Sequence, residues 1–213
     1  MLFSMPLALA RPGARSRRRH LAPLLLALAC APLQAAEVAG VPLADKVSLG
    51  GRELVLNGAG VRYRAVFKVY AAALYLPRAA ATPDEALAQQ GPKRISLTLL
   101  RDIDAGDLGK LFARGVQDNL ERGKLVPVLP GVMRMSDVVS QYKTLNAGDV
   151  IAFDWVPGQG TTLTIRGKPA AEPFKEPEFF EAVTRIWLGP KPADPALKEA
   201  MLGRKPAAPT TGG

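Results

Sequence analysis

The order of its predicted elements places this chain in the α+β class, built on an antiparallel sheet. Segments with strand character come first, a long helical stretch follows, and a hairpin pattern precedes two closing helical segments. The regular strand–helix alternation that is typical of a parallel sheet is not seen. About 177 residues follow the N-terminal segment described below, enough to form one domain with a sizeable core.

The first predicted strands are rich in β-branched and aromatic residues. Residues 47–56 alternate loosely around Gly50-Gly51, a pair typical of a hairpin turn. Residues 62–76 form a run of Val, Phe, Tyr and Ala without a breaker, so we expect one long strand there. Two-residue alternation places four polar side chains on one of its faces: Arg62, Arg64, Lys68 and Tyr70.

The middle of the chain is predicted to be mainly helical. Thr82-Pro83 opens a short helix with an N-cap and a first-position proline, and residues 93–100 return to a strand. Residues 104–122 carry apolar side chains at helical spacing, and we expect Gly123 to stop that helix. Residues 129–145 are a less regular helical candidate.

The C-terminal part reads as a hairpin followed by two helices. Residues 152–167 alternate on either side of the turn Pro157-Gly158-Gln159-Gly160. The first helix is expected over residues 178–188, and Asp194-Pro195 caps a second helix that ends at Gly203. Residues 204–213 are rich in Pro, Ala, Thr and Gly, which predicts a disordered tail after a domain over residues 37–203.

Residues 1–36 are predicted to be a cleaved signal peptide, which places the remaining chain in the periplasm or outside the cell. Arginines from Arg11 to Arg19 precede an apolar run over residues 21–33, and Ala35-Ala36 offer a cleavage site. The apolar run is too short to span a bilayer, so we expect no stable membrane insertion. Twin-arginine export at Ser16-Arg17-Arg18 and lipidation at Cys30 remain open alternatives.

Removal of this segment would change the chemistry available to the protein. It takes away His20 and Cys30, the chain's only histidine and cysteine, which excludes a Ser-His pair, a thiolate nucleophile and a disulfide. It also lowers the number of basic residues from 28 to 23 against 19 acidic ones, which argues against nucleic-acid binding. No dinucleotide, P-loop or EF-hand motif is found, and we expect neither a cofactor nor a metal site.

Two polar features of the sequence suggest a ligand site. If the face that carries Arg62 and Tyr70 lines a cleft, the guanidinium and the phenol can receive a carboxylate or an enolate oxygen. The alternative is that Arg62 caps a strand end and its neighbours are solvated. Asn119 lies on the apolar stripe of its helix, where its amide either contacts a ligand or satisfies a backbone group.

Several segments are similar to the chalcone isomerase family. In the strand region they are Gly58-Ala59-Gly60-Val61-Arg62, Phe67-Lys68-Val69-Tyr70 and Ala73-Leu74-Tyr75-Leu76. The C-terminal segments resemble the exported bacterial branch of that family: Phe179-Phe180, Ile186-Trp187-Leu188-Gly189-Pro190-Lys191-Pro192, and Leu197-Lys198 to Leu202-Gly203. The similarity runs from about residue 38 to residue 203, and the order and spacing of the segments carry it.

The resemblance implies an open-faced β-sandwich, in which a large antiparallel sheet and a layer of helices enclose a ligand cleft. It implies that Arg62 holds an anionic oxygen of the ligand and that Asn119 lies on the cleft-lining helix. Tyr70 falls where the plant isomerases have a threonine that polarises the ketone, and Phe112 falls where they have a water-positioning tyrosine. These two departures argue against flavonoid cyclisation, whereas a related fatty-acid-binding branch keeps the fold and the arginine.

The leading hypothesis is a periplasmic, non-catalytic protein that binds a small apolar carboxylate such as a fatty acid. The expected ligand-binding residues are Arg62, Tyr70, Phe112 and Asn119. An isomerase or intramolecular lyase is the first alternative, with Arg62 stabilising an oxyanion and Tyr70 assisting as a donor. A structural envelope module whose cleft is filled by its own side chains is the second.

Overall fold

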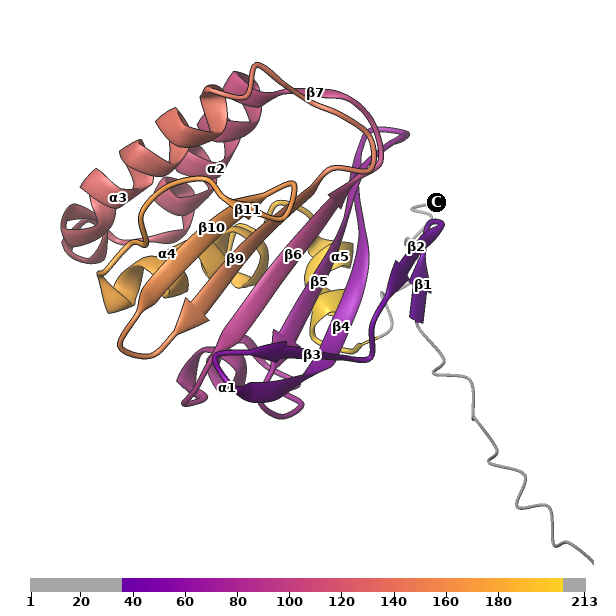
Figure 1. The fold of residues 1–213 in the computed structure, drawn as a ribbon, viewed down its shortest axis with the longest axis horizontal. Helices are drawn as coiled ribbons and strands as arrows, with labels where there is room; N and C mark the ends of the chain where they lie inside the picture. Colours follow the sequence, from indigo (N-terminus) through magenta and orange to yellow (C-terminus); the bar gives the residue numbers. More distant parts are fainter. Residues whose placement is uncertain (1–35, 205–213) are drawn as a thin grey trace, which may run out of the picture. The chain divides into compact units, whose positions relative to one another are not determined.

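A curled antiparallel sheet of seven strands forms the centre of the fold (Figure 1). The computed structural model describes residues 36–204, so the predicted signal peptide and tail lie outside the described residues except for Ala36 and Arg204. The strands follow the order β11-β10-β9-β6-β5-β4-β3. Their bounds are β3 Lys46–Leu49, β4 Arg52–Arg64, β5 Phe67–Leu76, β6 Lys93–Leu99, β9 Val150–Val156, β10 Gly160–Ile165 and β11 Lys168–Pro169. The predicted α+β class with an antiparallel sheet is confirmed.

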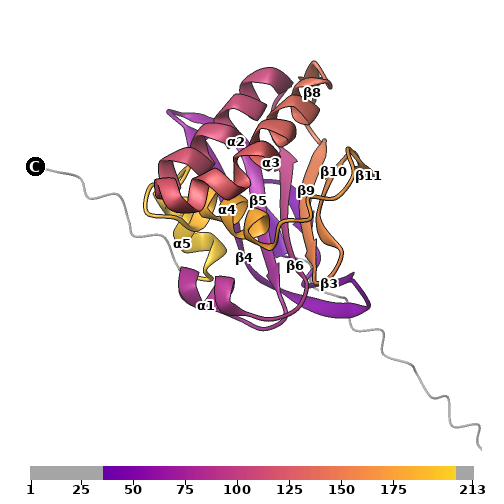
Figure 2. The ribbon, with the colours of Figure 1, turned by 90° about the vertical axis from the view of Figure 1, so that its left-hand side faces the viewer.

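A layer of helices covers one face of this sheet (Figure 2). The helices are α1 Pro83–Ala88, α2 Ala105–Asn119, α3 Arg122–Ser140, α4 Pro177–Leu188 and α5 Pro195–Met201. The main hydrophobic core lies between them and the sheet, where buried side chains of β5, β6 and β9 meet those of α2, α3 and α4. Two-stranded pairs complete the fold: β1 Ala36–Val38 with β2 Val41–Leu43, and β7 Ile103–Asp104 with β8 Thr144–Leu145.

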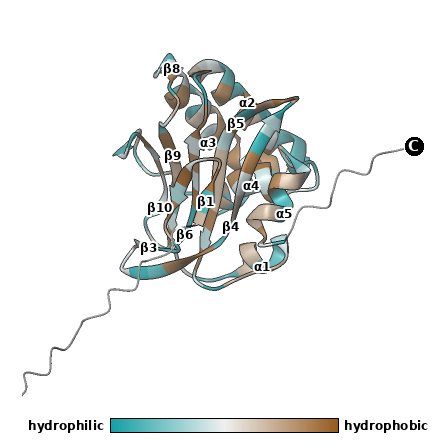
Figure 3. Ribbon diagram, turned by 90° about the vertical axis from the view of Figure 1, so that its right-hand side faces the viewer, coloured by the Kyte–Doolittle hydropathy of each residue, from teal (hydrophilic) through white to brown (hydrophobic). Residues whose placement is uncertain are grey.

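The opposite face of the sheet is covered only in part (Figure 3). A small second core under the β1–β2 pair contains Leu43, Leu54, Ala73 and Tyr75. Farther along the sheet, Arg94 of β6 donates two 2.6 Å hydrogen bonds to the carboxylate of Asp154, its partner on β9. On this face the sheet carries an ion pair, whereas on the other face it packs against helices.

Two glycines of β4 allow α5 to pack directly on the sheet. A Cβ atom at Gly58 would collide with the carbonyl oxygen of Ala200 and lie 2.7 Å from the backbone nitrogen of Gly203. A Cβ atom at Gly60 would lie 2.7 Å from the Cβ of Ala200. The Gly58-Ala59-Gly60 segment is therefore explained by close packing of the α5 backbone against a strand.

The prediction of one strand over residues 62–76 was wrong. The segment is a tight hairpin, in which β4 ends at Arg64, Ala65 and Val66 turn, and β5 begins at Phe67. Ala65 adopts a φ of 52°, a conformation usually taken by Gly, Asn or Asp in such turns. Because the turn contains none of these residues, no local signal in the sequence predicts it.

The helical boundaries also differ from those predicted in the middle of the chain. The first long helix, α2, begins after its N-cap Asp104, as expected, but ends at Asn119. Gly123 does not stop it and instead lies in the first turn of α3, which begins at Arg122. Pro127 and Pro130 lie inside α3, and they obscured its pattern because proline is rare in helix interiors. The predicted hairpin over residues 152–167 and both closing helices are confirmed.

Candidate functional site

Arg62 and Tyr70 are cross-strand neighbours near the β4–β5 turn. They are directly opposite each other in the β4–β5 register, and the Arg62 guanidinium carbon lies 5.6 Å from the centroid of the Tyr70 ring. The sequence placed them eight residues apart along one strand, whereas the hairpin brings them side by side. A β-bulge follows between Arg62 and Tyr63, a feature that often re-aims side chains at functional sites.

The Arg62 side chain is incompletely paired. Its Nε atom is buried and has no hydrogen-bond partner among residues 36–204. None of the ion pairs formed between described residues includes Arg62. A buried donor without a partner costs free energy, and a bound acceptor would remove that cost.

Tyr70 contributes a phenol that is held by the helical layer. Its hydroxyl accepts a 2.9 Å hydrogen bond from Nε1 of Trp187 on α4, and the side chain is fully buried. Burial raises the pKa of the Tyr70 phenol above its ordinary value, and the nearby positive charge of Arg62 opposes part of that shift. The phenol is therefore protonated at neutral pH and can act as a hydrogen-bond donor.

Two cavities meet at Arg62 and Leu111, which line both of them. The smaller, which we call the tyrosine cavity, has a volume of about 230 Å³ and lies between Tyr70, Phe112, Ile186 and the loop over residues 191–193. Arg114, Gly115 and Asp118 of α2 complete its lining.

The larger hollow, which we call the hairpin cavity, has a volume of about 480 Å³. It opens between the β4–β5 hairpin and the start of α2, and its size is typical of small-molecule pockets. Its lining is both apolar and charged: Phe67, Val69, Ile103, Leu108 and Leu111, with Arg62, Arg64, Arg101, Asp102, Asp104 and Asp107. Arg62 is thus a cation at the junction of two cavities, next to an apolar surface.

Phe112 lies at the boundary between the tyrosine cavity and the core. Its ring packs edge-on against Phe153 and Trp187, with ring centroids 5.8 and 6.0 Å away. Phe153 and Trp187 are fully buried, and the three rings fill the space between the centre of the sheet, α2 and α4. Phe112 therefore closes the inner end of the tyrosine cavity with an apolar wall and offers no polar group to a ligand.

Asn119 lines neither cavity and fastens to α2 the loop that borders the tyrosine cavity. Its Nδ2 atom donates hydrogen bonds of 2.8 Å to the carbonyl oxygens of Gly115 and Lys191, and its Oδ1 accepts a 2.7 Å bond from the backbone N–H of Lys191. A Cβ atom at Gly189 would collide with this amide, so the loop approaches as closely as a glycine allows. The structure therefore shows the second role foreseen for Asn119, satisfaction of backbone groups, and brings Arg62, Tyr70 and Phe112 together without it.

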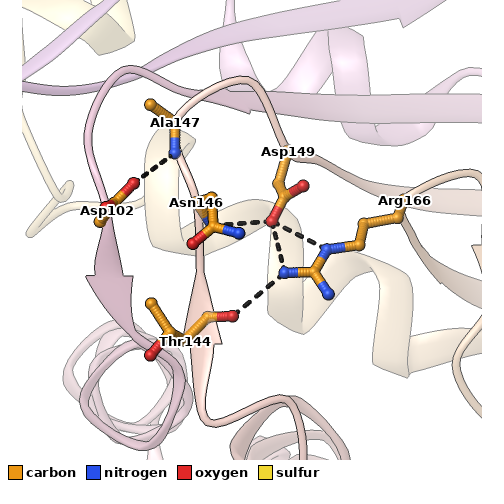
Figure 4. A network of polar contacts seen from close by, with 6 residues as sticks. All are labelled: Asp102, Thr144, Asn146, Ala147, Asp149 and Arg166. Atoms are coloured by element: carbon orange, nitrogen blue, oxygen red, sulfur yellow. Dashed lines mark hydrogen bonds and ion pairs between the residues drawn. The ribbon is translucent and has the colours of Figure 1, made fainter.

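A polar network holds the wall of the hairpin cavity on the side of β7 (Figure 4). Asp102 accepts a 2.8 Å hydrogen bond from the backbone N–H of Ala147. Two residues farther on, Asp149 accepts bonds from the backbone N–H of Asn146 at 2.7 Å and from Nε of Arg166 at 2.9 Å. Arg166 also donates to the carbonyl oxygen of Thr144. The network joins the end of β10 to the loop that carries part of the cavity wall.

We expect this network to make the stability of the protein sensitive to acid. The Arg166 hydrogen bond lowers the pKa of Asp149 below its ordinary value. Because this pKa is lower in the folded than in the unfolded chain, the stabilisation is complete above the ordinary carboxyl pKa of about 4 and is lost as the pH falls through the folded value. Thermal melts should show that Asp149→Asn lowers the melting temperature at neutral pH and weakens its dependence on acid. An Asp149→Asn variant whose melting temperature depends on pH as that of the wild type does would contradict this prediction. Glu53→Gln is the matched control, because Glu53 belongs to an exposed ion pair.

The residues of the hairpin cavity other than Arg62 were not predicted to form a site. Leu108 and Leu111 followed the helical periodicity of α2 and read simply as core, and Ile103 and Val69 carried no distinguishing signal. The bulge at Arg62 and the turn at Ala65 lie in the lining of this hollow, and both are features of the backbone. Their positions could not be obtained from side-chain patterns.

The described residues offer no metal centre and no membrane-spanning helix. Within residues 36–204, no group of three or more His, Cys, Asp or Glu is arranged to hold a metal ion. In the same range, no helix is both long enough and apolar enough to cross a bilayer. The groups that the candidate site offers to a ligand are the Arg62 guanidinium, the Tyr70 phenol and the apolar side chains of the two cavities.

These features define an α+β protein with one large antiparallel sheet and a ligand-sized cleft under its helical layer. Residues 35–203 match the family model described as chalcone isomerase-like. The chain therefore belongs to the chalcone isomerase-like family, as the sequence resemblance suggested. No curated protein matches it.

A solved structure has the same fold. The crystal structure of an Arabidopsis thaliana fatty-acid binding protein matches with a TM-score of 0.61 at 14% sequence identity. The match covers 76% of this chain and 92% of the plant protein. At this level of identity the likeness establishes the fold, and the function has to be argued from the site.

Proposed function

We propose that this protein binds a small apolar carboxylate, such as a fatty acid, in the cleft between sheet and helices without transforming it. The observation that carries the proposal is the partly buried Arg62, whose Nε atom lacks a partner among the described residues at the junction of two cavities. A guanidinium presents paired donors that match the two oxygens of a carboxylate. The similar plant protein is a fatty-acid binding protein, which supports the same ligand class.

The two cavities suggest how such a ligand lies. Its carboxylate would contact Arg62, and the protonated Tyr70 phenol lines the same cavity and is able to donate to the second oxygen. The acyl chain would extend through the hairpin cavity along Val69, Leu108 and Leu111. An apolar pocket with a few placed polar groups is the usual design of a lipid or small-molecule site.

We further propose that binding takes place in the periplasm. The basic and apolar segments within residues 1–36 support export, and the absence of any other histidine or cysteine in the chain suits a role without nucleophilic catalysis. An exported carrier of an apolar acid would keep that acid soluble between two membranes. N-terminal sequencing of the protein recovered from a periplasmic fraction tests this assignment.

The test of the ligand is a fluorescence titration with cis-parinaric acid on protein produced from the full-length gene. Arg62→Met should weaken binding roughly 10- to 100-fold, because a charge-assisted hydrogen bond contributes about 1.5–3 kcal/mol. Arg62→Lys should retain part of the affinity, and Arg122→Met, at an exposed arginine of α3, should retain all of it. The methyl ester of the same acid should bind the wild type as weakly as the acid binds Arg62→Met. Equal affinity of ester and acid would show that Arg62 does not hold a carboxylate.

A lyase reaction is the second candidate, because Tyr70 and Arg62 line one small cavity. A phenol kept protonated by burial and an adjacent guanidinium are suited to stabilise a developing oxyanion. Absorbance decay of a chalcone with the wild type, but not with Arg62→Met, would favour this reaction over simple binding. If no ligand stabilises the protein and Arg62→Met lowers its melting temperature, the cleft serves structure alone.

A further inference from the structure

The β4–β5 hairpin ends in a group of exposed apolar side chains, which we call the hairpin tip (residues 63–67). Tyr63 is 47% exposed, Val66 is 83% exposed and Phe67 is 60% exposed. These are three of only seven large hydrophobic side chains that are exposed among residues 36–204. In Figure 1 the turn extends past the neighbouring strands of the sheet, and in Figure 3 its end is coloured as hydrophobic. A concentration of exposed apolar groups at a projecting point indicates a contact surface.

The turn itself departs from the usual chemistry of a hairpin. Two-residue turns favour Asn, Asp or Gly, which are polar or flexible and accept a positive φ. Here Ala65 takes the positive φ of 52°, and the most exposed position is occupied by the β-branched Val66. Folding alone gains nothing from this choice, since it strains the backbone and exposes an apolar side chain to water.

Several cations lie at the tip, and one carboxylate, that of Asp194, accepts a 3.0 Å hydrogen bond from the backbone N–H of Tyr63. Arg64 lies within the tip and Lys68 directly follows it, and Arg101 lies across it with its guanidinium carbon 5.3 Å from the centroid of the Phe67 ring. No acidic residue occurs between residues 62 and 68. Three carboxylates line the adjoining hairpin cavity, and each has a partner: Asp102 with the backbone of Ala147, Asp104 with the backbone of Asp107, and Asp107 with Lys110.

From these observations we infer that the hairpin tip docks on the surface of an anionic lipid bilayer. Aromatic and aliphatic side chains beside Arg and Lys are the combination that enters the headgroup region of anionic membranes. Three side chains expose far less surface than the roughly 800 Å² per partner that a standard protein–protein interface buries, so a second copy or another protein fits this tip poorly. Insertion of a small wedge requires no such area.

Docking at the tip would also place the hairpin cavity against the bilayer. Arg64, Ala65 and Phe67 belong both to the tip region and to the lining of that cavity. A route between cavity and membrane would then pass no bulk water. The docking surface does not depend on the identity of the cavity's ligand, so the two proposals are tested separately.

The test uses vesicles of equal parts phosphatidylglycerol and phosphatidylcholine. Val66→Asp should lower the partition of the protein into these vesicles about tenfold or more, because it places a carboxylate at the most exposed point of the tip. Lys68→Glu should weaken binding to the anionic vesicles but not to pure phosphatidylcholine. Met133→Asp is the matched control, since Met133 is 59% exposed on α3, and it should bind like the wild type. Neither Val66 nor Met133 lines either cavity, so titration with cis-parinaric acid should be unchanged in both variants.

A position-specific label shows whether the hairpin tip itself contacts the bilayer, even if residues 1–36 also contact lipid. In a Cys30→Ser background, an environment-sensitive fluorophore on Val66→Cys should shift to the blue when anionic vesicles are added. The same fluorophore on Met133→Cys should not shift. Equal shifts at both positions, no shift at position 66, or a Val66→Asp variant that alters the oligomeric state but not vesicle binding would overturn the inference.

Discussion

Replacement of Gly58 by alanine should destabilise the protein by about 3 kcal/mol, because overpacking at a rigid contact is costly. The new Cβ would collide with the carbonyl oxygen of Ala200 and lie within 2.9 Å of backbone atoms of Met201 and Gly203. These are backbone atoms at the end of α5, so no flexible side chain can move aside to relieve the clash. Urea unfolding monitored by circular dichroism measures the loss.

The effect of Gly58→Ala should extend to the binding site. Helix α5 is tied to residues close in sequence to the lining of the tyrosine cavity, because Lys198 donates a 2.9 Å hydrogen bond to the carbonyl oxygen of Gly189, and Asp194 accepts one from the backbone N–H of Tyr63. Displacement of α5 should therefore weaken the proposed fatty-acid binding as well as folding. Gly123→Ala is the control, since no atom lies within 4 Å of its added Cβ and alanine favours the helix there. Wild-type stability of Gly58→Ala would show that α5 does not pack on β4 as described.

The sequence predicted the elements of the fold wherever local chemistry was ordinary. Gly50-Gly51, Thr82-Pro83 and Asp194-Pro195 each marked a turn or a cap, and the structure has β3–β4, α1 and α5 at those places. The prediction failed at Ala65 and Val66, where a turn is made by residues with no turn preference. Tertiary pairing of β4 with β5 determines this turn, and a local pattern cannot report it.

In the candidate site, too, local sequence patterns predicted which residues matter but not which distant residues they contact. Arg62 and Tyr70 were selected because they were expected on one strand face, and they do lie together, but across a hairpin. Asn119 was selected for its inward position on a helix, and its partner proves to be the backbone of Lys191, 72 residues away. A polar residue in an apolar stripe indicates a buried partner, but the helix pattern alone does not tell whether that partner is a ligand or a loop.

The aromatic side chains under the helical layer limit the space that is left for a ligand. The central space under the helices is filled by the rings of Phe112, Phe153 and Trp187, and the two cavities at Arg62 lie beside this cluster, one toward the β4–β5 hairpin and one toward the loop over residues 191–193. Arg62 lies where the two cavities meet, and residues of the hairpin tip line the hairpin cavity. The proposed ligand site and the proposed docking surface therefore adjoin each other at the β4–β5 hairpin.

The replacement of Phe112 by alanine should lower the free energy of unfolding by about 3–5 kcal/mol, the usual cost of removing a buried aromatic side chain. The ring is almost fully buried and contacts both Phe153 and Trp187, so its loss leaves a hollow that joins the tyrosine cavity. Thermal melts and urea unfolding measure this cost. Phe112→Leu, which keeps most of the volume, should lose much less.

The same variant tests where the ligand lies. If the acyl chain runs through the hairpin cavity, the hollow left by Phe112→Ala opens on the far side of Arg62 from the tail, and the affinity for long and short fatty acids should change by a similar factor. If the chain instead enters the tyrosine cavity, the enlarged space should favour longer acids over shorter ones. Chain-length selectivity that shifts in the variant would place the tail against α4, while unchanged selectivity would place it beneath the β4–β5 hairpin.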